Sequence, residues 1–311
     1  MNIATLTVNP ALDKSTRADL ILPSIKIRCS SPAFEPGGGG INVSRALKKM
    51  EVNSTAIYLA GGHAGNVIHK RLDEEGVNQI QIDTGIETRE NLLVMEENSG
   101  QQYRFGMPGK DVPENKWHMA LEKIRMLEPV PDYLVASGSV PPGVPDNFYA
   151  QVAEVCKERE IKVIVDTSGK PLRLALEAGI YMAKPNFREL AKVMEQPDMS
   201  EMELEKYVNR FLQKGKCEAL IISMGAKGVI LATQESTDYI IPPHVSVVSS
   251  VGAGDSMVAG ILYGLANGFQ LMGAARYGVA AGTAATMTPG SELCRKKDVE
   301  RIFQWLSPDL E

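Results

Sequence analysis

Residues 36–75 have the sequence PGGGGINVSRALKKMEVNSTAIYLAGGHAGNVIHKRLDEE, in which a glycine run leads into a helix-like segment, a strand-like segment and a second helix-like segment. In the first of these segments, Val43, Leu47 and Met50 keep the 3.6-residue period of a helix. Residues 55–60 form a short, continuous apolar run, which is typical of a buried strand. Helices that alternate with buried strands indicate a parallel sheet with helices on both faces.

The same alternation continues along the chain. The further strand-like and helix-like segments are residues 3–8, 133–137, 147–158, 162–166, 181–184, 186–195, 201–215 and 219–223, with helices after 254, after 269 and from 297. A length of 311 residues allows two domains or one large α/β domain. The sequence contains no internal repeat, low-complexity tract or linker that would mark a boundary. The predicted fold class is therefore α/β, with a mostly parallel sheet flanked by helices on both faces.

Two segments break this alternation and predict a small separate sheet. Residues 15–34 alternate without a helical period, and residues 89–97 and 101–107 flank an Asn98-Ser99-Gly100 turn like the arms of a hairpin. Strands inserted between βα units cannot all join the parallel sheet. We therefore expect a lid over its carboxyl edge, formed by segments of about 15–35 and 88–108. An edge hairpin of the main sheet is the alternative.

Composition and charge exclude several classes of function. The 38 acidic and 33 basic residues give a net charge of −5, so no basic field exists to bind nucleic acid or an anionic membrane. The start of the chain lacks a signal-peptide pattern, and no apolar stretch approaches the roughly 18 residues of a spanning helix, so we expect a cytoplasmic protein. The four cysteines show no C-x-x-C spacing and the histidines no H-E-x-x-H, which argues against disulfide, zinc and redox chemistry.

The segment Val251-Gly252-Ala253-Gly254-Asp255 leads into an apolar helix of small residues. Unpaired N–H groups at such a helix start, together with the positive end of the helix dipole, suit an anion such as a transferring phosphoryl group. Asp255 would then lie in the first turn, beside that anion. The alternative is that Asp255 only caps its own helix.

The glycine run before Ile41 and Asn42 is costly for the folded state. Each glycine forfeits about 0.5–1 kcal/mol of chain entropy relative to alanine, so four forfeit roughly 2–4 kcal/mol. Close approach of the backbone to a ligand would compensate for this cost, with the Asn42 amide orienting the ligand. A flexible linker is the alternative, although linkers rarely lead directly into an amphipathic helix.

Other strand ends carry candidate ligand contacts. Asn186 and Glu189 follow the strand-like run that ends at Lys184, and they lie one helical turn apart on the same face. Such a loose pair suits Mg²⁺ when phosphates and water supply its other ligands; the alternative is a capping box. Residues 223–228 and 137–139 are glycine-containing turns at the carboxyl ends of strand-like runs, where open α/β sheets bind ligands. The alternative is that each is a plain tight turn with no ligand.

Cations gather on the predicted lid. Asp13 follows the first strand, and Lys26, Arg28, Arg89 and Arg104 all come from the lid segments. In an acidic chain, cations concentrated on one small sheet are what a phosphorylated small substrate needs. Scattered, solvated charges are the alternative.

Together and in this order, the motifs resemble those of the ribokinase-like PfkB carbohydrate kinases over effectively the whole chain. The stretches that carry the resemblance are TLTVNPALD at 5–13, EPGGGGINV at 35–43, SGSVPPG at 137–143, VIVDTSG at 163–169 and GAGDSMV at 252–258. The resemblance implies a single ribokinase-like α/β domain over residues 1–311 with a small β-sheet lid. It also implies ATP-dependent phosphoryl transfer to a sugar phosphate, with Mg²⁺, and a homodimer formed through the lid sheet.

The resemblance implies roles for particular residues. Asp255 would be the base, while the N–H groups of Gly252, Ala253 and Gly254 stabilise the phosphoryl oxygens. The family's sugar-phosphate positions match Asp13, Gly38, Gly39, Asn42, Arg89 and Ser139, with Lys26 nearby on the lid. Its nucleotide positions match Lys184, Asn186, Ser223, Gly225, Gly228 and Thr283, and its metal-associated glutamate, which holds Mg²⁺ through water, matches Glu189. The candidates for binding K⁺ through backbone carbonyls are Ser249, Val251, Ala285, Thr288 and Gly290.

Substrate choice within the family depends on the glycine run. Related 1-phosphofructokinases and tagatose-6-phosphate kinases usually carry lysine at the place of Gly39, so this glycine favours transfer to the 1-hydroxyl of fructose 6-phosphate, a 6-phosphofructokinase reaction. Those two activities are the alternatives, and a sugar-phosphate or nucleotide sensor without catalysis is a third. Glu292 stands where close relatives usually have arginine, which leaves the need for K⁺ open.

Overall fold

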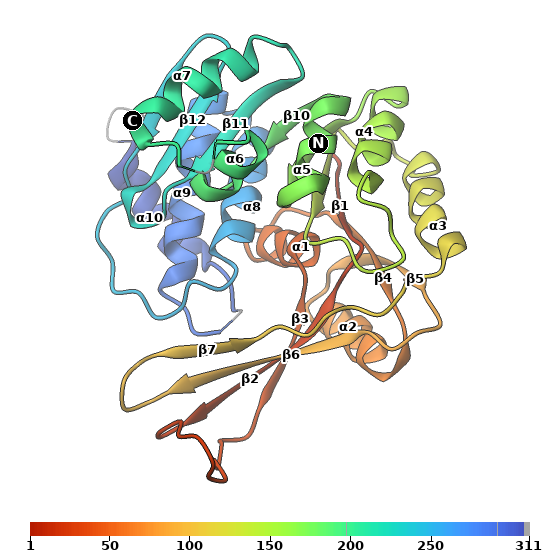
Figure 1. Ribbon diagram of the computed structural model, residues 1–311, viewed down its shortest axis with the longest axis vertical. Helices are drawn as coiled ribbons and strands as arrows, with labels where there is room; N and C mark the ends of the chain where they lie inside the picture. Colours follow the sequence, from red (N-terminus) through yellow and green to blue (C-terminus); the bar gives the residue numbers. More distant parts are fainter. Residues whose placement is uncertain (197, 291, 308–311) are drawn as a thin grey trace.

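The computed structural model describes residues 1–196, 198–290 and 292–307, and within these ranges two sheets form the body and the lid (Figure 1). The body contains a nine-stranded sheet of order β13-β12-β11-β10-β9-β8-β1-β4-β5. Its strands are β1 (Ile3–Thr7), β4 (Thr55–Ala60), β5 (Asn78–Asp83), β8 (Tyr133–Ser137), β9 (Lys162–Asp166), β10 (Ile180–Ala183), β11 (Cys217–Ser223), β12 (Val229–Thr233) and β13 (Thr237–Ile240). All neighbours pair in parallel except β11–β12 and β12–β13. The predicted α/β class is confirmed.

Helices cover both faces of this sheet. They are α1 (Gly39–Lys49), α2 (Gly62–Glu74), α3 (Glu114–Arg125), α4 (Phe148–Glu158), α5 (Gly169–Ala178), α6 (Phe187–Val193), α7 (Glu201–Leu212), α8 (Ala253–Ala266), α9 (Leu271–Thr286) and α10 (Lys296–Leu306). Side chains of a strand alternate between faces: Leu134 of β8 packs in a core with α3 to α7, and Val135 packs in another with α1 and α8 to α10. Burial on both faces explains why the strands are continuous apolar runs. No helix in the described ranges has the length and apolar character needed to cross a bilayer.

The strand order reverses beside β1, which pairs with β4 on one side and β8 on the other. From β1 the chain moves outward through β4 to β5, and from β8 it moves outward the other way through β9 to β11, so the connections after the carboxyl ends of β1 and β8 diverge and open a crevice. Ligands of open α/β sheets bind in such a crevice. The carboxyl ends of β1, β8 and β9 therefore place Thr7, Ser137 and Asp166 at one edge of the sheet.

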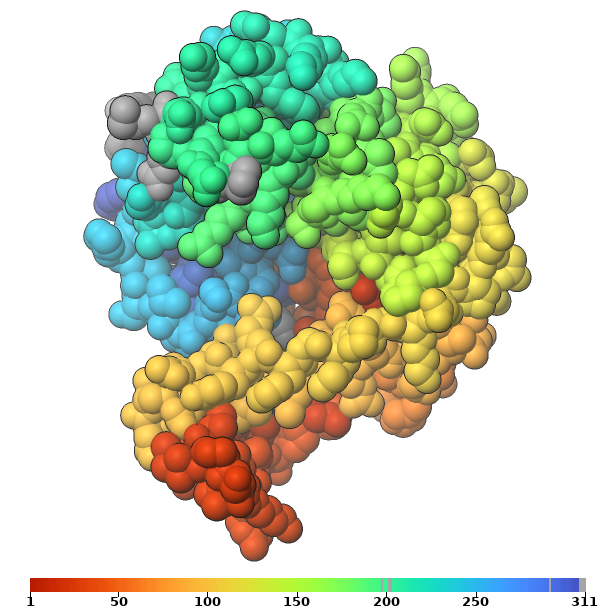
Figure 2. All heavy atoms as spheres, viewed as in Figure 1, coloured from red at the N-terminus to blue at the C-terminus, as the bar shows by residue number. Residues whose placement is uncertain are grey.

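The lid is a separate four-stranded sheet of order β3-β2-β6-β7, which excludes an edge hairpin of the main sheet. Its strands are β2 (Ala11–Ala18), β3 (Ala33–Gly37), β6 (Arg89–Glu96) and β7 (Gln102–Phe105). Residues 19–32, which the sequence pattern placed in the lid sheet, form an irregular connection between β2 and β3. Figure 2 shows the lid projecting from the body below α8 and α9.

Glycine and alanine bring α8 and α9 into close contact. A Cβ atom at Gly260 would lie 2.7 Å from Ala281 Cβ and 2.8 Å from the Tyr277 carbonyl oxygen. A Cβ at Gly278 would lie 2.5 Å from Ile261 Cγ1. No room therefore exists for a methyl group at Gly260 or Gly278, and this contact holds α8 against α9.

We predict that Gly260→Ala destabilises the protein by about 1–3 kcal/mol, the usual effect of overpacking, although alanine is the better helix former by nearly 1 kcal/mol. Gly273→Ala in α9 is the matched control, because its Cβ would be 3.5 Å from Phe269 Cβ, an ordinary contact. Urea denaturation should show the control to be as stable as the parent protein or more stable. Equal effects of the two substitutions would contradict the packing argument.

Candidate active site

The first turn of α8 forms the centre of the site. Gly252 is its N-cap residue with φ of 71°, in the left-handed region that favours glycine. A Cβ there would also lie 2.4 Å from Leu293 Cδ2. Ala253, Gly254 and Asp255 follow in the first turn, where N–H groups have no acceptor within the helix. The segment therefore has the geometry of an anion site with a carboxylate beside it.

Asp255 is held by α1, far away in the sequence. Asn42 Nδ2 donates a hydrogen bond of 2.8 Å to Asp255 Oδ2. Within the described ranges, the Asp255 side chain makes this one hydrogen bond and none to the N–H groups of its own helix, which disfavours a pure capping role. Burial, and next the charge of Asp166, raise the pKa of Asp255 to about 6, whereas Asn42 and Lys184 oppose the rise. A carboxylate in this setting can accept a proton near neutral pH.

A buried lysine lies between two carboxylates. Lys184, which directly follows β10, has its Nζ 3.2 Å from Asp166 Oδ1, and a Cβ at Gly254 would lie 3.1 Å from the same Nζ. Burial lowers the pKa of Lys184, but Asp166 and then Asp255 outweigh it, and the net shift is upward. Lys184 is therefore a fixed cation at the start of α8. Sequence reasoning gave Asp166 no role, although its place at the end of β9 was a signal for one.

The lid contributes polar groups on the opposite side of the crevice. Asp13 Oδ1 accepts a hydrogen bond of 2.8 Å from Asn91 Nδ2, a residue that the sequence did not single out. Burial raises the pKa of Asp13, opposed by Asn91 and Arg89. A cavity of about 120 Å³ opens here between the lid and the segment before α8; it is lined by Asp13, Ser15, Asn91, Leu92, Leu93, Arg104, Phe105, Gly106 and Val251.

Arg89 ties the lid to the end of β1. Its Nη2 donates to the Asn9 carbonyl oxygen and its Nη1 to that of Met107, each at 3.0 Å. Asn9 Nδ2 in turn donates to Ser139 Oγ at 2.9 Å. The predicted residues Asp13, Arg89 and Ser139 are thus joined to the crevice through Asn91 and Asn9.

The glycine run approaches the backbone and side chains of neighbouring strands. A Cβ at Gly39 would lie 2.0 Å from Ser137 Oγ, and Gly38 has φ of 119°, which side-chain-bearing residues rarely adopt. The run therefore packs against the carboxyl ends of β1 and β8 and is no flexible linker. Asn42, four residues after Gly38, follows in the first turns of α1.

Lys26 lies apart from these residues within one chain. It belongs to residues 19–32, beyond the Ser15–Ala33 pairing, whereas Asp13 pairs with Glu35 near the root of the lid. The Lys26 side chain is exposed and makes no hydrogen bond or ion pair within the described ranges.

On the other side of α8, Asn186 and Glu189 form a capping box at the start of α6. Asn186 Oδ1 accepts from the Glu189 N–H at 2.9 Å, and Glu189 Oε2 accepts from the Asn186 N–H at 2.8 Å. Asn186 and Glu189 therefore do cap α6, as the alternative interpretation predicted. The capping box uses Glu189 Oε2 and leaves Glu189 Oε1 for a ligand. The described residues include no group of three or more His, Cys, Asp or Glu arranged around a metal.

The remaining predicted contacts lie on turns next to these elements. Ser223 ends β11 and its N–H donates to the Pro185 carbonyl oxygen at 3.0 Å. Gly225, with φ of 63°, begins a 3₁₀ turn, η1 (Gly225–Lys227), and Gly228, with φ of 100°, directly follows it. Thr283 lies on α9 next to Gly282, where a Cβ would be 3.1 Å from the Ala253 carbonyl oxygen. Ser223 thus lies beside Asn186, and the residue before Thr283 lies beside the start of α8.

The five candidates for a monovalent cation come from two adjoining segments. Ser249 Oγ donates to the Gly290 carbonyl oxygen at 3.3 Å and accepts from the Val251 N–H at 3.2 Å. The Ala285 carbonyl oxygen accepts from Thr288 Oγ at 2.8 Å. The Ser249 N–H also donates to the Thr286 carbonyl oxygen at 3.2 Å, so the segment before α8 lies beside the end of α9.

Comparison with known proteins gives a consistent result. Residues 7–298 match the model of the pfkB family carbohydrate kinase. The chain is 38% identical over 308 residues to the ATP-dependent 6-phosphofructokinase isozyme 2 of Escherichia coli, covering 99% of each chain. It is 33% identical over 303 residues to the 1-phosphofructokinase of Borreliella burgdorferi, covering 97% of this chain and 96% of that one. The crystal structure of phosphofructokinase-2 from Escherichia coli in complex with substrates and products has a TM-score of 0.93 at 38% identity, and the match covers 99% of this chain and 100% of that one. The chain belongs to the pfkB family of carbohydrate kinases.

Proposed function

We propose that this kinase is an ATP-dependent 6-phosphofructokinase, which converts fructose 6-phosphate and ATP into fructose 1,6-bisphosphate and ADP. The observation that carries the proposal is the placement of Asp255, which Asn42 holds at the anion-binding start of α8. The 6-phosphofructokinase relative from Escherichia coli supports the choice of substrate, as does Gly39. The relative from Borreliella burgdorferi, a 1-phosphofructokinase, makes that activity the second candidate.

In this reaction Asp255 accepts the proton of the sugar 1-hydroxyl as that oxygen attacks the γ-phosphorus of ATP. The N–H groups of Gly252, Ala253 and Gly254 stabilise charge on the phosphoryl oxygens, and Lys184 adds a fixed positive charge beside them. Positioning and electrostatics account for most of the catalysis of phosphoryl transfer. The arrangement needs no nucleophilic residue of the protein.

The sugar phosphate binds between lid and body in this proposal. Its contacts are Asp13, Gly38, Gly39, Asn42, Arg89 and Ser139. Arg104 lines the cavity beside Asp13 and contributes a second cation for the 6-phosphate. The nucleotide lies on the other side of α8, against Lys184, Asn186, Ser223, Gly225, Gly228 and Thr283.

One acidic residue suits the Mg²⁺ that ATP brings with it, since this ion keeps several waters and takes phosphate oxygens as ligands. Glu189 would hold it through water, and the ion would neutralise charge on the phosphates. K⁺ would be held by backbone carbonyls, those of Ser249, Val251, Ala285, Thr288 and Gly290. A relative from Escherichia coli that has been crystallised with potassium supports this proposal.

We also propose that the whole chain is one domain and acts in the cytoplasm, where thiols such as the four free cysteines stay reduced.

We further propose a homodimer formed through the lid. The lid exposes Leu20, Leu22, Ile25, Phe105 and Met107 to between 44% and 60%, a set too apolar for a free surface. Val94 in β6, by contrast, is only 6% exposed and already packed within the chain. An oligomeric form of the relative from Escherichia coli, described as tetrameric and inhibited, supports self-association.

A coupled ATP-consumption assay tests the substrate. We expect fructose 6-phosphate to give the highest kcat/KM among fructose 6-phosphate, fructose 1-phosphate, tagatose 6-phosphate and ribose. A phosphate on the sugar should be essential, because Arg89 and Arg104 face the sugar side of the crevice. Preference for ribose would contradict the role of the lid cations, and preference for fructose 1-phosphate would favour the second candidate.

Asp255→Asn tests the base. We expect kcat to fall by about 10²–10⁴, the usual contribution of a positioned base, with nucleotide affinity nearly unchanged. In the parent enzyme, kcat/KM should fall tenfold per pH unit below about 6, because the Asp255 carboxylate is protonated there.

The same variant has a predictable effect on stability. The folded-state pKa of Asp255 lies above its ordinary value of 3.8. Ionisation of Asp255 therefore lowers the free energy of unfolding as the pH rises from 3.8 through about 6, and it has no effect on stability below pH 3.8. Asp255→Asn should therefore raise Tm at pH 8 but not at pH 4. Asp146→Asn, at an exposed carboxylate paired with Lys170, is the control and should change neither kcat nor the acid limb. Full activity of Asp255→Asn would assign the residue to structure alone.

Paired substitutions Leu22→Asp and Ile25→Asp test the lid interface. We expect sedimentation equilibrium to show that the Kd of the dimer rises at least tenfold, because the dimer would have to bury two carboxylates without partners. Met126→Asp, at a 71% exposed position on the end of α3, is the control and should leave the dimer intact. A dimer unaffected by the lid substitutions would place the interface elsewhere.

A further inference from the structure

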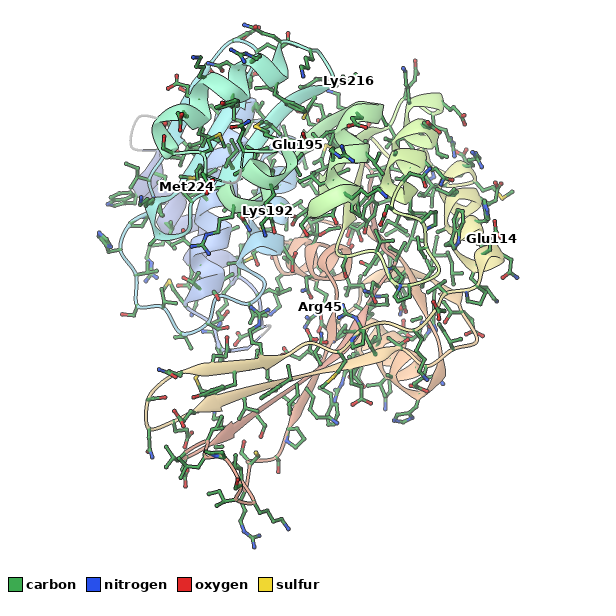
Figure 3. All side chains as sticks on the ribbon, in the orientation of Figure 1. Arg45, Glu114, Lys192, Glu195, Lys216 and Met224 are labelled. Carbon is green, nitrogen blue, oxygen red and sulfur yellow. The ribbon has the colours of Figure 1, made fainter. Side chains whose placement is uncertain are left out.

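One buried arginine connects the candidate base to the root of the lid. Arg45 lies on α1, one turn after Asn42 and on the same face, and its side chain is only 3% exposed. Figure 3 shows Arg45 where α1 meets the lid strands. Its surroundings come from elements far apart in the sequence, and no motif drew attention to it.

Arg45 is held in place by a carboxylate at the end of α2. Its Nε donates to Glu75 Oε2 at 2.8 Å and its Nη2 to Glu75 Oε1 at 2.7 Å. This is the two-pronged geometry in which a guanidinium is most tightly oriented. With that end fixed, the remaining nitrogen, Nη1, points toward the start of α1.

The Nη1 atom reaches two acceptors at that point. It donates to the Pro36 carbonyl oxygen in β3 at 2.9 Å and, in a longer bond, to Asn42 Oδ1 at 3.5 Å. A second carboxylate, Glu35 in the lid strand β3, lies 3.8 Å from Nη2. Arg45 therefore contacts both the lid strand that leads into the glycine run and the amide that holds Asp255.

The chemistry of the amide makes this contact consequential. An asparagine side chain can present either its oxygen or its NH₂ group to a neighbour, and its partners decide which. A guanidinium only donates and an ionised carboxylate only accepts. With Arg45 on one side and Asp255 on the other, the amide satisfies both in a single orientation, with Oδ1 toward Arg45 and Nδ2 toward Asp255.

We propose that Arg45 is a positioning residue, which fixes the Asn42 amide so that it donates to Asp255 and couples that orientation to the root of the lid through Pro36 and Glu35. This inference rests on the proposed role of Asp255 as the base. Without Arg45 the Asn42 oxygen loses the donor that fixes it, and the amide can rotate away from Asp255. The carboxylate would then lose its hydrogen bond, and its ionised form would be less favoured.

The test is a titration of Asp255 by ¹³C NMR in the protein without substrates, with the signal assigned by its loss in Asp255→Asn. Other charges that act on this carboxylate are Asp166, Lys184 and Asp13, and all are retained in the variants. We expect Arg45→Met to raise the pKa of Asp255 by about one unit, the equivalent of one hydrogen bond to a charged group. The acid limb of kcat/KM should move by the same amount, with the KM for ATP within twofold.

A double variant separates positioning from plain charge. In the Asn42→Ala background, Arg45→Met should cause no further rise in the pKa of Asp255, because Arg45 acts through the amide. A further rise of the same size would mean that the charge of Arg45 acts directly, and would overturn the proposal. Since Arg45→Met also leaves Glu75 unpaired, Arg45→Lys is included; it keeps the charge but loses the fork, and should still raise the pKa.

The matched control is Arg159→Met. Arg159 is also largely buried, donates to the carbonyl oxygens of Ile124 and Leu127 at 3.3 and 3.1 Å, and pairs with Glu128 at 2.9 Å. Its loss should lower stability without moving the titration. An unshifted pKa in both Arg45 variants would reduce Arg45 to a structural role. Because the titration uses no substrate, this failure is distinct from failure of the proposed reaction, which the substrate assay reports.

Discussion

Lys184 lies between Asp166 and the first turn of α8, and it makes a crowded group of carboxylates tolerable at one edge of the sheet. Asp13, Asp166 and Asp255 would otherwise repel one another in a setting with little water. The cation offsets part of that repulsion, and Asn42 adds a hydrogen bond, but the balance still leaves Asp255 with a pKa raised to about 6. The raised pKa means that the folded protein disfavours the ionised form of Asp255, so a contribution to stability does not explain this carboxylate. A carboxylate perturbed in this way is the expected signature of a functional group.

Much of this arrangement could be predicted from the sequence, because periodicity reports burial and strand ends report the edge of a parallel sheet. The start of α8, the glycine run and the lid were found in this way. Asp166 and Arg45 were not, because their partners are set by the pairing of β9 with β10 and by where the end of α2 comes to lie beside α1. Neither contact leaves a local pattern. Asn186 and Glu189 show a different limit, since a capping box and a metal-associated pair require the same two residues at the same spacing.

The glycine run serves both the body and the lid. It packs against the ends of β1 and β8, where a methyl group at Gly39 would overlap Ser137. It also continues directly from β3, whose Pro36 carbonyl accepts from Arg45. The proposed sugar side of the crevice is therefore built on this junction of body and lid, although its cations, Arg89 and Arg104, come from the lid strands β6 and β7. Lys26 lies beyond this junction, at a place that periodicity alone could not determine.

The most direct test of Asp255 as the base is a crystal structure of the enzyme with ADP, a planar metal-fluoride mimic of the phosphoryl group and fructose 6-phosphate. We predict that the mimic binds to the N–H groups of Gly252 to Gly254 and that the sugar 1-hydroxyl lies about 3 Å from an Asp255 carboxylate oxygen. An acceptor hydroxyl bonded to another residue, with Asp255 turned away from the mimic, would contradict it.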